Sequence, residues 1–394
     1  MVDLRCSNLF RENRVIDKST VSPITIEDYE PTAIFLEDIT NKRFNKSFWL
    51  DRFEYWWDKN PAMTENIIRG CVIRGKNGGI GGFFGNIPIK YYIMGEEKVA
   101  CCTTSWYVGE EYKKRSLELL IPFLKQKGAA FLLDTTPSEK VAKMLIQIDF
   151  KNLDKEWLRK DAFYLVNLIE FWSYFTRRYV SNKALLFLFK VIGILVIPAI
   201  KLFQIILKLR FPKMYGKYTF SEIQRFGKSY TLLWEKFKEK YNVLAVRNEV
   251  TLNWFFFGSK DLLSSRKVIE LRYIDEIIGY VAVKEVGHNI HGKVYYSLEV
   301  VDMVILNNQT SAYDVALKGL LWLARNSEKK IIFILINPFV ENIKHCLLKH
   351  GYFIIRGKSR FLYKQTGEHD NDLCESIDKG YYATPLDGDR CFFP

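Results

Sequence analysis

The feature of this sequence that most constrains its fold is an order of elements that occurs twice. Between Lys98 and Phe150 the chain reads as a strand, a basic turn, a helix, a strand and a second helix. A looser version of the same order returns between Tyr295 and Phe353. Each copy follows a stretch with glycine turns and alternating apolar residues, which is typical of antiparallel strands. The sequence therefore predicts a duplicated α/β unit.

Length, composition and charge agree with two such units. The chain has 394 residues, of which 48% are hydrophobic and 26% are charged, as expected for a globular protein with two domains. Its formal net charge of +13 favours an anionic partner: nucleic acid, acidic lipid headgroups or a phosphorylated cofactor. No helix-turn-helix, zinc-finger or aromatic RNA-binding motif accompanies the charge, so we expect no nucleic-acid partner.

The seven cysteines and five histidines predict neither disulfides nor a metal site. The cysteines are scattered and form no Cys-x-x-Cys pair, which is typical of proteins in a reducing cytosol. Cys101 or Cys102 could accept an acyl group, although a buried free cysteine is commonly inert. His345 and His350 are five residues apart on a predicted helix and do not share a face.

A basic run lies between the strand and the helix of the first copy. It consists of Lys113, Lys114, Arg115 and Ser116. If this run opens the helix, free backbone N–H groups and the helix dipole add to its charge, which suits the phosphates of coenzyme A. The alternative is a solvated basic helix start. The second copy has NNQTS, residues 307–311, at this place and therefore no positive charge.

The order of elements resembles the GCN5-related N-acetyltransferase (GNAT) fold, repeated in tandem over most of the chain. VGEEYKKRSLELL, Val108 to Leu120, is similar to the segment with which that family binds the pyrophosphate of its cofactor, with Ser116 and Glu118 in place of glycines. GGFFGNIP, Gly81 to Pro88, is similar to the central strands of bacterial GNAT-like proteins. The resemblance implies an α/β (α+β) fold with two GNAT-like mixed-sheet domains joined by an apolar helical insert.

The resemblance also implies an acyl-CoA site in the first copy, with acetyl-CoA or another acyl-CoA as donor. The expected cofactor-binding residues are Tyr107, Val108, Lys113, Lys114, Arg115 and Ser116. Many relatives use a tyrosine on the last helix as the acid, but this sequence has Leu145 and Leu347 there. Asp134 and Tyr107 are the substitute candidates for acid–base catalysis, although an aspartate at a strand end more often caps the next helix.

The end of the chain carries a compact charged feature, YYATPLDGDRCFFP. Asp387 and Asp389 could bind a polyhydroxylated or amino-bearing acceptor if this tail folds back over the cleft. The alternative is an Asp-Gly turn with a solvated ion pair.

The strongest apolar stretch runs from Ala184 to Leu209 and is long enough to span a bilayer. Lys190, Lys201 and Lys208 interrupt it, and Pro198 should kink it. A single span would also put the two copies on opposite sides of the membrane. We therefore expect either a helical hairpin in the membrane interface, broken near Pro198, or a buried helical pair between the domains.

Four parts follow from these observations. Residues 20–165 are the expected N-terminal GNAT-like domain with the acyl-CoA site, and 166–215 are the apolar, basic-flanked insert. Residues 216–365 are the C-terminal GNAT-like domain, which would shape the acceptor side, and 366–394 are the tail.

The expected function is acyl-CoA-dependent N-acylation, by direct transfer, of an amine-bearing small molecule or a cell-envelope or polysaccharide precursor. We expect a cytoplasmic protein, peripheral on the inner face of the membrane if residues 184–209 contact lipid. The alternative is a catalytically degenerate tandem GNAT-like protein that binds a lipid, peptide or protein partner. The sequence leaves the acyl chain and the oligomeric state open.

Overall fold

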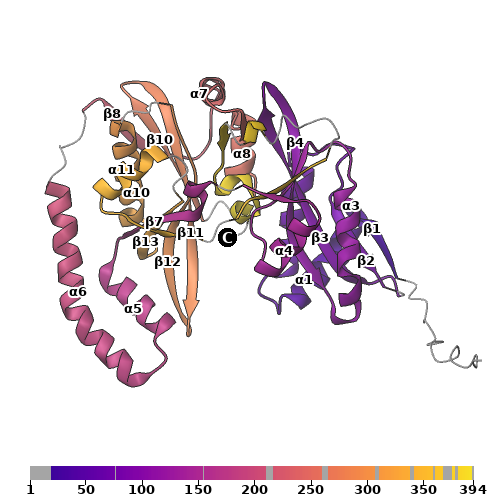
Figure 1. Ribbon diagram of the computed structural model, residues 1–394, viewed down its shortest axis with the longest axis horizontal. Coiled ribbons are helices and arrows are strands. Elements are labelled where there is room, and N and C mark those ends of the chain that lie inside the picture. Colours follow the sequence, from indigo (N-terminus) through magenta and orange to yellow (C-terminus); the bar gives the residue numbers. More distant parts are fainter. Residues whose placement is uncertain are drawn as a thin grey trace, which may run out of the picture. The chain divides into compact units, whose positions relative to one another are not determined.

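The computed structural model describes residues 19–75, 77–153, 155–209, 216–259, 265–306, 310–337, 341–357, 360–366, 375–377 and 380–392. The chain forms two compact units (Figure 1). Unit 1 comprises the residues up to Trp57, Thr64–Ile87 and Thr103–Gly128. Unit 2 comprises Asp58–Met63, Pro88–Cys102 and the chain from Ala129 onward. Strands β3 (Ile80–Ile93) and β4 (Glu96–Val108) contribute residues to both units.

Unit 1 combines antiparallel strands with short helices around an aromatic core. Its other elements are β1 (Thr20–Pro23), α1 (Tyr29–Ile39), α2 (Lys46–Phe53), β2 (Gly70–Arg74), the 3-10 helix η3 (Glu110–Leu119) and α3 (Leu120–Leu124). Strand β2 pairs antiparallel with β1 and with the first part of β3. Helix α2 begins where the Asn45 side chain accepts the backbone N–H of Phe48, at 2.9 Å. The buried rings of Phe53 and Trp57 stack 5.0 Å apart and form the centre of the core.

The first half of unit 2 holds the β-α segment of the first copy. Strand β4 pairs in parallel with β5 (Phe131–Asp134), whose residues are all buried. Helix α4 (Glu139–Gln147) follows and is capped by Ser138, as the sequence Pro-Ser-Glu suggests. The last part of β3 pairs with β9 (Val243–Ala245), which pairs in parallel with β16 (Tyr381–Tyr382) from the end of the chain.

A seven-stranded mixed sheet forms the rest of unit 2, in the order β14-β7-β13-β12-β11-β10-β8. Its strands are β7 (Lys160–Leu165), β8 (Tyr218–Ile223), β10 (Arg266–Tyr273), β11 (Glu276–Ile290), β12 (Lys293–Ile305), β13 (Ile331–Ile336) and β14 (Phe353–Arg356). Among the residues that the structure describes, β12 and β13 form the one parallel pair of this sheet, and the other neighbouring strands pair antiparallel. Its helices are α7 (Ser229–Lys238), α8 (Glu249–Phe257), α10 (Thr310–Asn326) and α11 (Glu341–Lys349). The order of elements in the second copy thus repeats that of the first, and the expected α/β class with mixed sheets is confirmed.

The two copies exchange their last strands. Strand β7, which follows the first copy in the chain, lies between β13 and β14 of the second copy. Strand β15 (Leu362–Gln365), which follows the second copy, lies between β5 and β6 (Lys151–Asn152) of the first. The expected domain ranges 20–165 and 216–365 follow the chain, whereas this exchange places each last strand in the sheet of the other copy.

The insert is a helical hairpin of α5 (Leu168–Tyr179) and α6 (Lys183–Leu209). The expected break near Pro198 is wrong, because α6 continues through this residue as one helix of 27 residues. Pro198 has no backbone N–H, so the carbonyl group of Ile194 loses its hydrogen bond within the helix. Ile194 is exposed, so water can donate to this carbonyl group instead. The buried helical pair is also wrong, since only 6% of the most apolar stretch of α6 is buried.

Candidate acyl-CoA segment and acid–base cluster

The segment expected to bind the cofactor follows β4 directly in unit 1. Val108 is the last residue of β4, and Gly109, in an extended conformation, caps η3. The helix therefore begins at Glu110, three residues before the basic run, and its first turn carries the carboxylates of Glu110 and Glu111. The expectation that Lys113 opens the helix is wrong, because the glycine already supplies the cap position. The free N–H groups at the helix start lie beside carboxylates rather than lysines.

The basic side chains in η3 differ in how firmly they are held. Lys113 pairs with Glu110 at 2.5 Å in an exposed ion pair, which contributes about 0–1 kcal/mol and is easily exchanged for a phosphate. Lys114 is exposed. Arg115 contacts both carboxylate oxygens of Glu118, at 3.0 and 2.6 Å. The two lysines are therefore the cations available to a ligand, and Arg115 stabilises the helix.

Two glycines position this segment by making room for Tyr112. A Cβ atom at Gly81 in β3 would collide with the Tyr112 ring, and one at Gly75 would lie 2.5 Å from its hydroxyl oxygen. The Gly109 N–H also donates to the Gly81 carbonyl group, at 2.9 Å. The glycines around β3 thus seat the start of η3 on the strand, which is a packing reason for the pattern that resembles GNAT-like proteins.

Strand β4 has an irregular backbone just before this segment. Ser105 has φ 51°, in the left-handed region that residues other than glycine seldom adopt and that occurs at bulges. Tyr107, two residues later, is half-buried and lies edge-on to Trp49, with ring centroids 6.4 Å apart. The expected cofactor residues thus lie together in unit 1, whereas Asp134, the other acid–base candidate, belongs to unit 2.

Asp134 ends β5, and the chain tail packs against the turn that follows. Its Oδ1 atom accepts the backbone N–H of Thr136 at 3.2 Å, so it caps this turn. The Thr136 hydroxyl donates to Oδ1 of Asp389, at 2.7 Å. A Cβ atom at Gly388 would collide with Thr135, which shows how closely the tail approaches. Asp389 is therefore brought to the end of β5, which the sequence alone did not predict.

The carboxyl group of Asp389 is the most suitable acid–base group of this cluster. Burial raises its pKa to about 6, against the opposing effects of hydrogen bonds from Thr136 and Thr135 and of the Lys284 charge. A carboxyl group that titrates near neutral pH can accept and return a proton under physiological conditions.

Asp387 has a different role, because it is fully buried in an ionic network. Arg247 contacts Asp302 at two points, 3.0 and 3.2 Å, and Asp387 at 3.4 Å. The Thr384 backbone N–H and the Tyr91 hydroxyl also donate to Asp387, at 2.5 and 3.3 Å. Burial raises the pKa of Asp387, and Arg247 opposes this increase. The alternative of a solvated ion pair in the tail is wrong, since Asp387 anchors the tail inside unit 2.

The remaining candidates lie in the core. Cys101 and Cys102 are fully buried, and burial raises the pKa of the Cys102 thiol well above its usual value, so it stays protonated and is a poor nucleophile. Leu145 and Leu347, at the positions of the family's acid, are also buried. The stretch 307–309 of the second copy lies outside the described residues.

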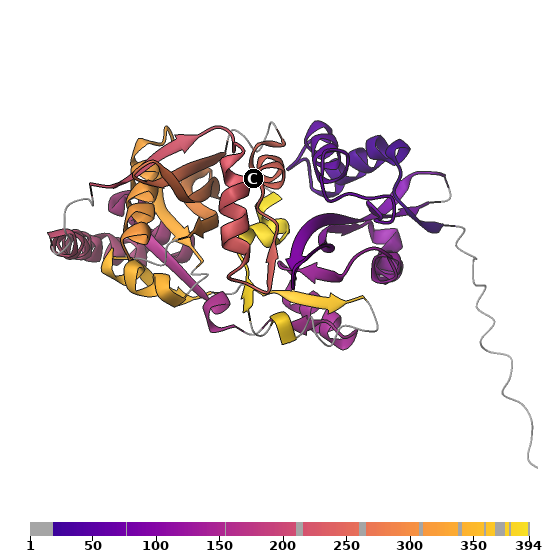
Figure 2. The same ribbon diagram turned by 90° about the horizontal axis from the view of Figure 1, so that it is seen from above.

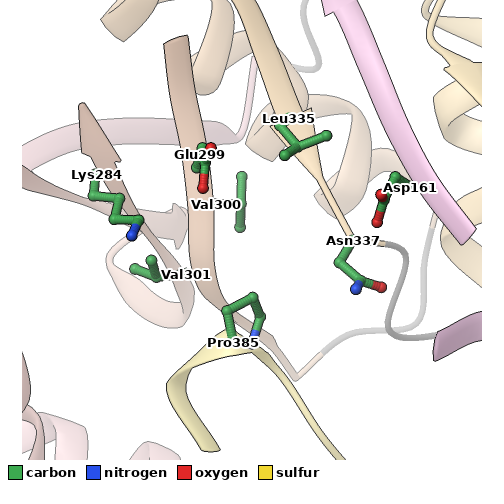
Figure 3. A pocket seen from close by; sticks show the side chains of 8 residues that line it. All are labelled: Asp161, Lys284, Glu299, Val300, Val301, Leu335, Asn337 and Pro385. Atoms are coloured by element: carbon green, nitrogen blue, oxygen red, sulfur yellow. The ribbon is translucent and has the colours of Figure 1, made fainter. Parts of the chain in front are cut away.

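A recess in unit 2 opens where β12 and β13 stop pairing (Figure 3). Their pairs run from Tyr296↔Ile331 to Glu299↔Leu335, and Val301 is left unpaired opposite β11. The recess is small, with a volume of about 10 Å³, so it has room for one small group such as the end of an amine side chain. The residues that line it are Asp161, Lys284, Glu299, Val300, Val301, Leu335, Asn337 and Pro385. Its charged lining consists of two carboxylates and the ammonium group of Lys284, which leaves one net negative charge toward a cationic group.

Sequence reasoning missed Arg247, Asp302, Lys284 and Glu299. For Glu299, Asp302 and Lys284 the available signal was a charged residue inside an otherwise apolar strand, as in LEVVDMVI and YVAVKEV. Such residues are rarely buried unless they have a partner, so each one marks a network or a site.

The comparisons with known proteins show the fold. No protein-family model matches the sequence, and no curated protein matches it either. The structure is similar to that of Saccharomyces cerevisiae N-myristoyltransferase with bound myristoyl-CoA, at a TM-score of 0.53 and 11% identity, over 88% of this chain and 82% of that chain. It is also similar to a conserved protein of unknown function from Enterococcus faecalis V583, a probable N-acyltransferase, at a TM-score of 0.53 and 10% identity, over 88% of this chain and 73% of that chain.

The expectation from the sequence is thereby confirmed at the level of the fold. The chain consists of two GNAT-like mixed-sheet domains in tandem, joined by an apolar helical insert.

Proposed function

We propose that this protein transfers an acyl group from an acyl-CoA to an amine. The observation that carries the proposal is the fold shared over 88% of the chain with an N-myristoyltransferase that holds myristoyl-CoA. A shared fold supports a reaction class only when the site offers the necessary chemistry. The roles of donor, proton acceptor and acceptor substrate are therefore assigned from the residues.

The donor is assigned to the η3 segment in unit 1. The exposed ammonium groups of Lys113 and Lys114 would bind the phosphates of the acyl-CoA. Tyr107 and Val108, at the end of β4, would lie beside the pantetheine chain. Arg115 and Ser116 would support these contacts from the second turn of η3, since Arg115 is held by Glu118.

The proton acceptor is assigned to Asp389, with Asp134 beside the same turn. In the transfer, the amine nitrogen attacks the thioester carbonyl carbon, a C–N bond forms and the C–S bond breaks. Before the attack, a bound ammonium group loses one proton to solvent; during the transfer the nitrogen loses a second proton to the Asp389 carboxylate, and the departing thiolate takes up one proton from solvent. A carboxyl group with a pKa of about 6 is ionised at pH 7 and is still basic enough for this task.

The acceptor is assigned to a cationic amine. The carboxylates of Asp161 and Glu299 line the recess at the end of the β12–β13 pairing together with one ammonium group, that of Lys284 (Figure 3). The net negative charge that remains would attract an ammonium group before it is deprotonated. An amine-bearing small molecule or cell-envelope precursor fits this chemistry. The N-myristoyltransferase likeness adds a peptide amine as a further acceptor class.

A second function is favoured by what the site lacks. Leu145 and Leu347 replace the family's acid, and Ser116 and Glu118 replace its glycines. These substitutions favour a protein that binds a lipid, peptide or protein partner without turnover.

Thiol release separates the two functions. The purified full chain is incubated with acetyl-CoA or myristoyl-CoA and a panel of amines, and free coenzyme A is measured. Transfer predicts amine-dependent release that Asp389→Asn reduces and that the exposed-turn control Asp275→Asn does not. If acyl-CoA binds but no amine accelerates release, the binding function is the correct one.

A further inference from the structure

Helix α6 lies at the outer edge of unit 2 (Figures 1 and 2). It presents an apolar surface that the rest of this unit leaves uncovered. Leu195, at its middle, is 75% exposed. The exposed large apolar residues of the helix are Leu185, Phe187, Leu188, Val191, Ile192, Ile194, Leu195, Leu202, Phe203, Ile205 and Ile206. A continuous apolar surface of this kind on a protein marks a contact with another apolar phase.

The opposite side of α6 is held against its own unit. The Trp172 indole N–H of α5 donates to the Phe189 carbonyl group at 2.9 Å, and Gly193 faces the same indole ring. Further along, the Gln204 side-chain amide donates to the Leu165 carbonyl group at 3.0 Å. The helix is thus attached near both ends and lies flat on the unit, with its exposed side facing outward.

The lysines of α6 share one line along the helix. They occupy positions 183, 190, 201 and 208, at spacings of seven, eleven and seven residues. Each residue rotates the helix by about 100°, so a spacing of seven residues falls about 20° short of two full turns and a spacing of eleven exceeds three full turns by about 20°. The two deviations have opposite signs, so the four lysine positions stay within about 20° of one another around the helix. Gly193 and Gln204 each follow a lysine by three residues, about 60° away. The lysine line therefore borders the attached side, and Lys190 and Lys201 are exposed.

We propose that α6 binds flat on an anionic lipid surface. Its outward side chains would enter the region between headgroups and acyl chains, and Lys190 and Lys201 on its flank would reach lipid phosphates. The helix contains no acidic residue, and exposed Arg177 and Arg178 at the end of α5 extend the basic flank. This charge pattern selects anionic lipid over a neutral apolar partner.

The same observations argue against a membrane span. Residues Ala184–Leu207 are long and apolar enough to cross a bilayer. A span would, however, place Lys190 and Lys201 inside the hydrocarbon, each about 8 Å from its centre, where a lysine costs up to about 2.5–3.5 kcal/mol on insertion scales. It would also remove the contacts of Trp172 and Gln204 with their partners.

Vesicle flotation of the full chain tests the proposal. Vesicles of phosphatidylcholine alone are compared with equal mixtures of phosphatidylcholine and phosphatidylglycerol. We expect binding to the anionic vesicles, weakened by salt. The double variant Lys190→Gln/Lys201→Gln should bind about 30-fold more weakly, because each lysine near the surface contributes about a factor of five. Lys228→Gln/Lys236→Gln, a pair of exposed lysines on and before α7, is the matched control and should bind like the wild type.

A second variant tests the apolar side. Ile194→Asn/Leu195→Gln should lose flotation while its circular dichroism and its coenzyme A binding stay unchanged, because both side chains point away from the unit. Absence of binding to anionic vesicles, or equal binding to neutral ones, would overturn the proposal. So would resistance to alkaline carbonate, which indicates a span, or a dimer in gel filtration that this variant dissociates. None of these readouts depends on acyl transfer.

Discussion

The substitution Arg247→Met tests whether a buried ionic network holds the chain end in place. Arg247 is buried and joins three segments: it contacts Asp302 in β12, Asp387 and Thr384 in the tail, and the Ala245 carbonyl group. Its guanidinium group also lies 5.0 Å from the centre of the Tyr382 ring. The carboxylates raise the pKa of Arg247 well above its ordinary value, although burial alone would lower it.

Methionine fills a similar volume but leaves both carboxylates buried without a counter-charge. Asp302 and Asp387 are each fully buried, so the loss of their cation should cost about 3–5 kcal/mol of the free energy of unfolding. An ion pair that is exposed on both sides provides the control. Lys143 pairs with Glu139 on the surface of α4, with side-chain exposures of 74% and 72%, and Lys143→Met should cost less than about 1 kcal/mol.

Urea unfolding followed by circular dichroism measures the cost, and limited proteolysis reports the tail. Arg247→Met should expose the segment after Tyr382 to protease before the rest of unit 2. The triple variant Arg247→Met/Asp302→Asn/Asp387→Asn should recover part of the loss, because it no longer buries unpaired charge. If Arg247→Met unfolds at the same urea concentration as Lys143→Met, the network does not anchor the tail.

Three further predictions concern the proposed site. Lys113→Ala/Lys114→Ala should weaken acyl-CoA binding about tenfold, because each exposed lysine–phosphate pair contributes roughly 1 kcal/mol or less. Calorimetry measures the affinity, and the exposed lysines Lys42 and Lys127, both changed to alanine, provide the control. Gly81→Ala should displace Tyr112, destabilise the protein by about 1–3 kcal/mol in thermal unfolding and weaken acyl-CoA binding, whereas Gly79→Ala, whose Cβ meets nothing within 4 Å, should do neither. Burial raises the pKa of Asp389 to about 6 in the folded state, whereas its pKa in the unfolded chain is roughly 3.9. The unfolded state therefore ionises more easily, and the wild type loses stability as the pH rises from about 4 to 7. Asp389→Asn should therefore gain stability relative to the wild type over that range, and its pH–rate profile should lack the pKa near 6; a stability difference that is constant with pH would refute this.

The sequence predicted the elements whose signals are local. Strand β4, strand β5 and helix α4 were expected because the apolar pattern of each lies within a few neighbouring residues. The start of η3 was misplaced because the charges of Lys113 to Arg115 were given more weight than the extended Gly109, which decides where the helix begins.

Features that depend on distant partners were not predictable from one sequence. Strands β7 (KDAFYL) and β15 (LYKQ) are short and mix polar with apolar residues, and nothing local specifies that each pairs in the sheet of the other copy. Arg247 is 55 residues from Asp302 and 140 from Asp387, so their contact is a property of the tertiary fold. Asp389 likewise contacts Thr136, which lies 253 residues earlier in the chain, and the burial that raises its pKa is a property of the tertiary fold.

Calorimetric titration of the full chain with acyl-CoA tests the central claim most directly. Acetyl-CoA and myristoyl-CoA are titrated into the wild type, the Lys113→Ala/Lys114→Ala variant and the Lys42→Ala/Lys127→Ala control. The proposed function predicts saturable binding of one acyl-CoA per chain, weakened about tenfold in the first variant and unchanged in the second. Absence of binding to either acyl-CoA, or equal affinity in all three proteins, would contradict it.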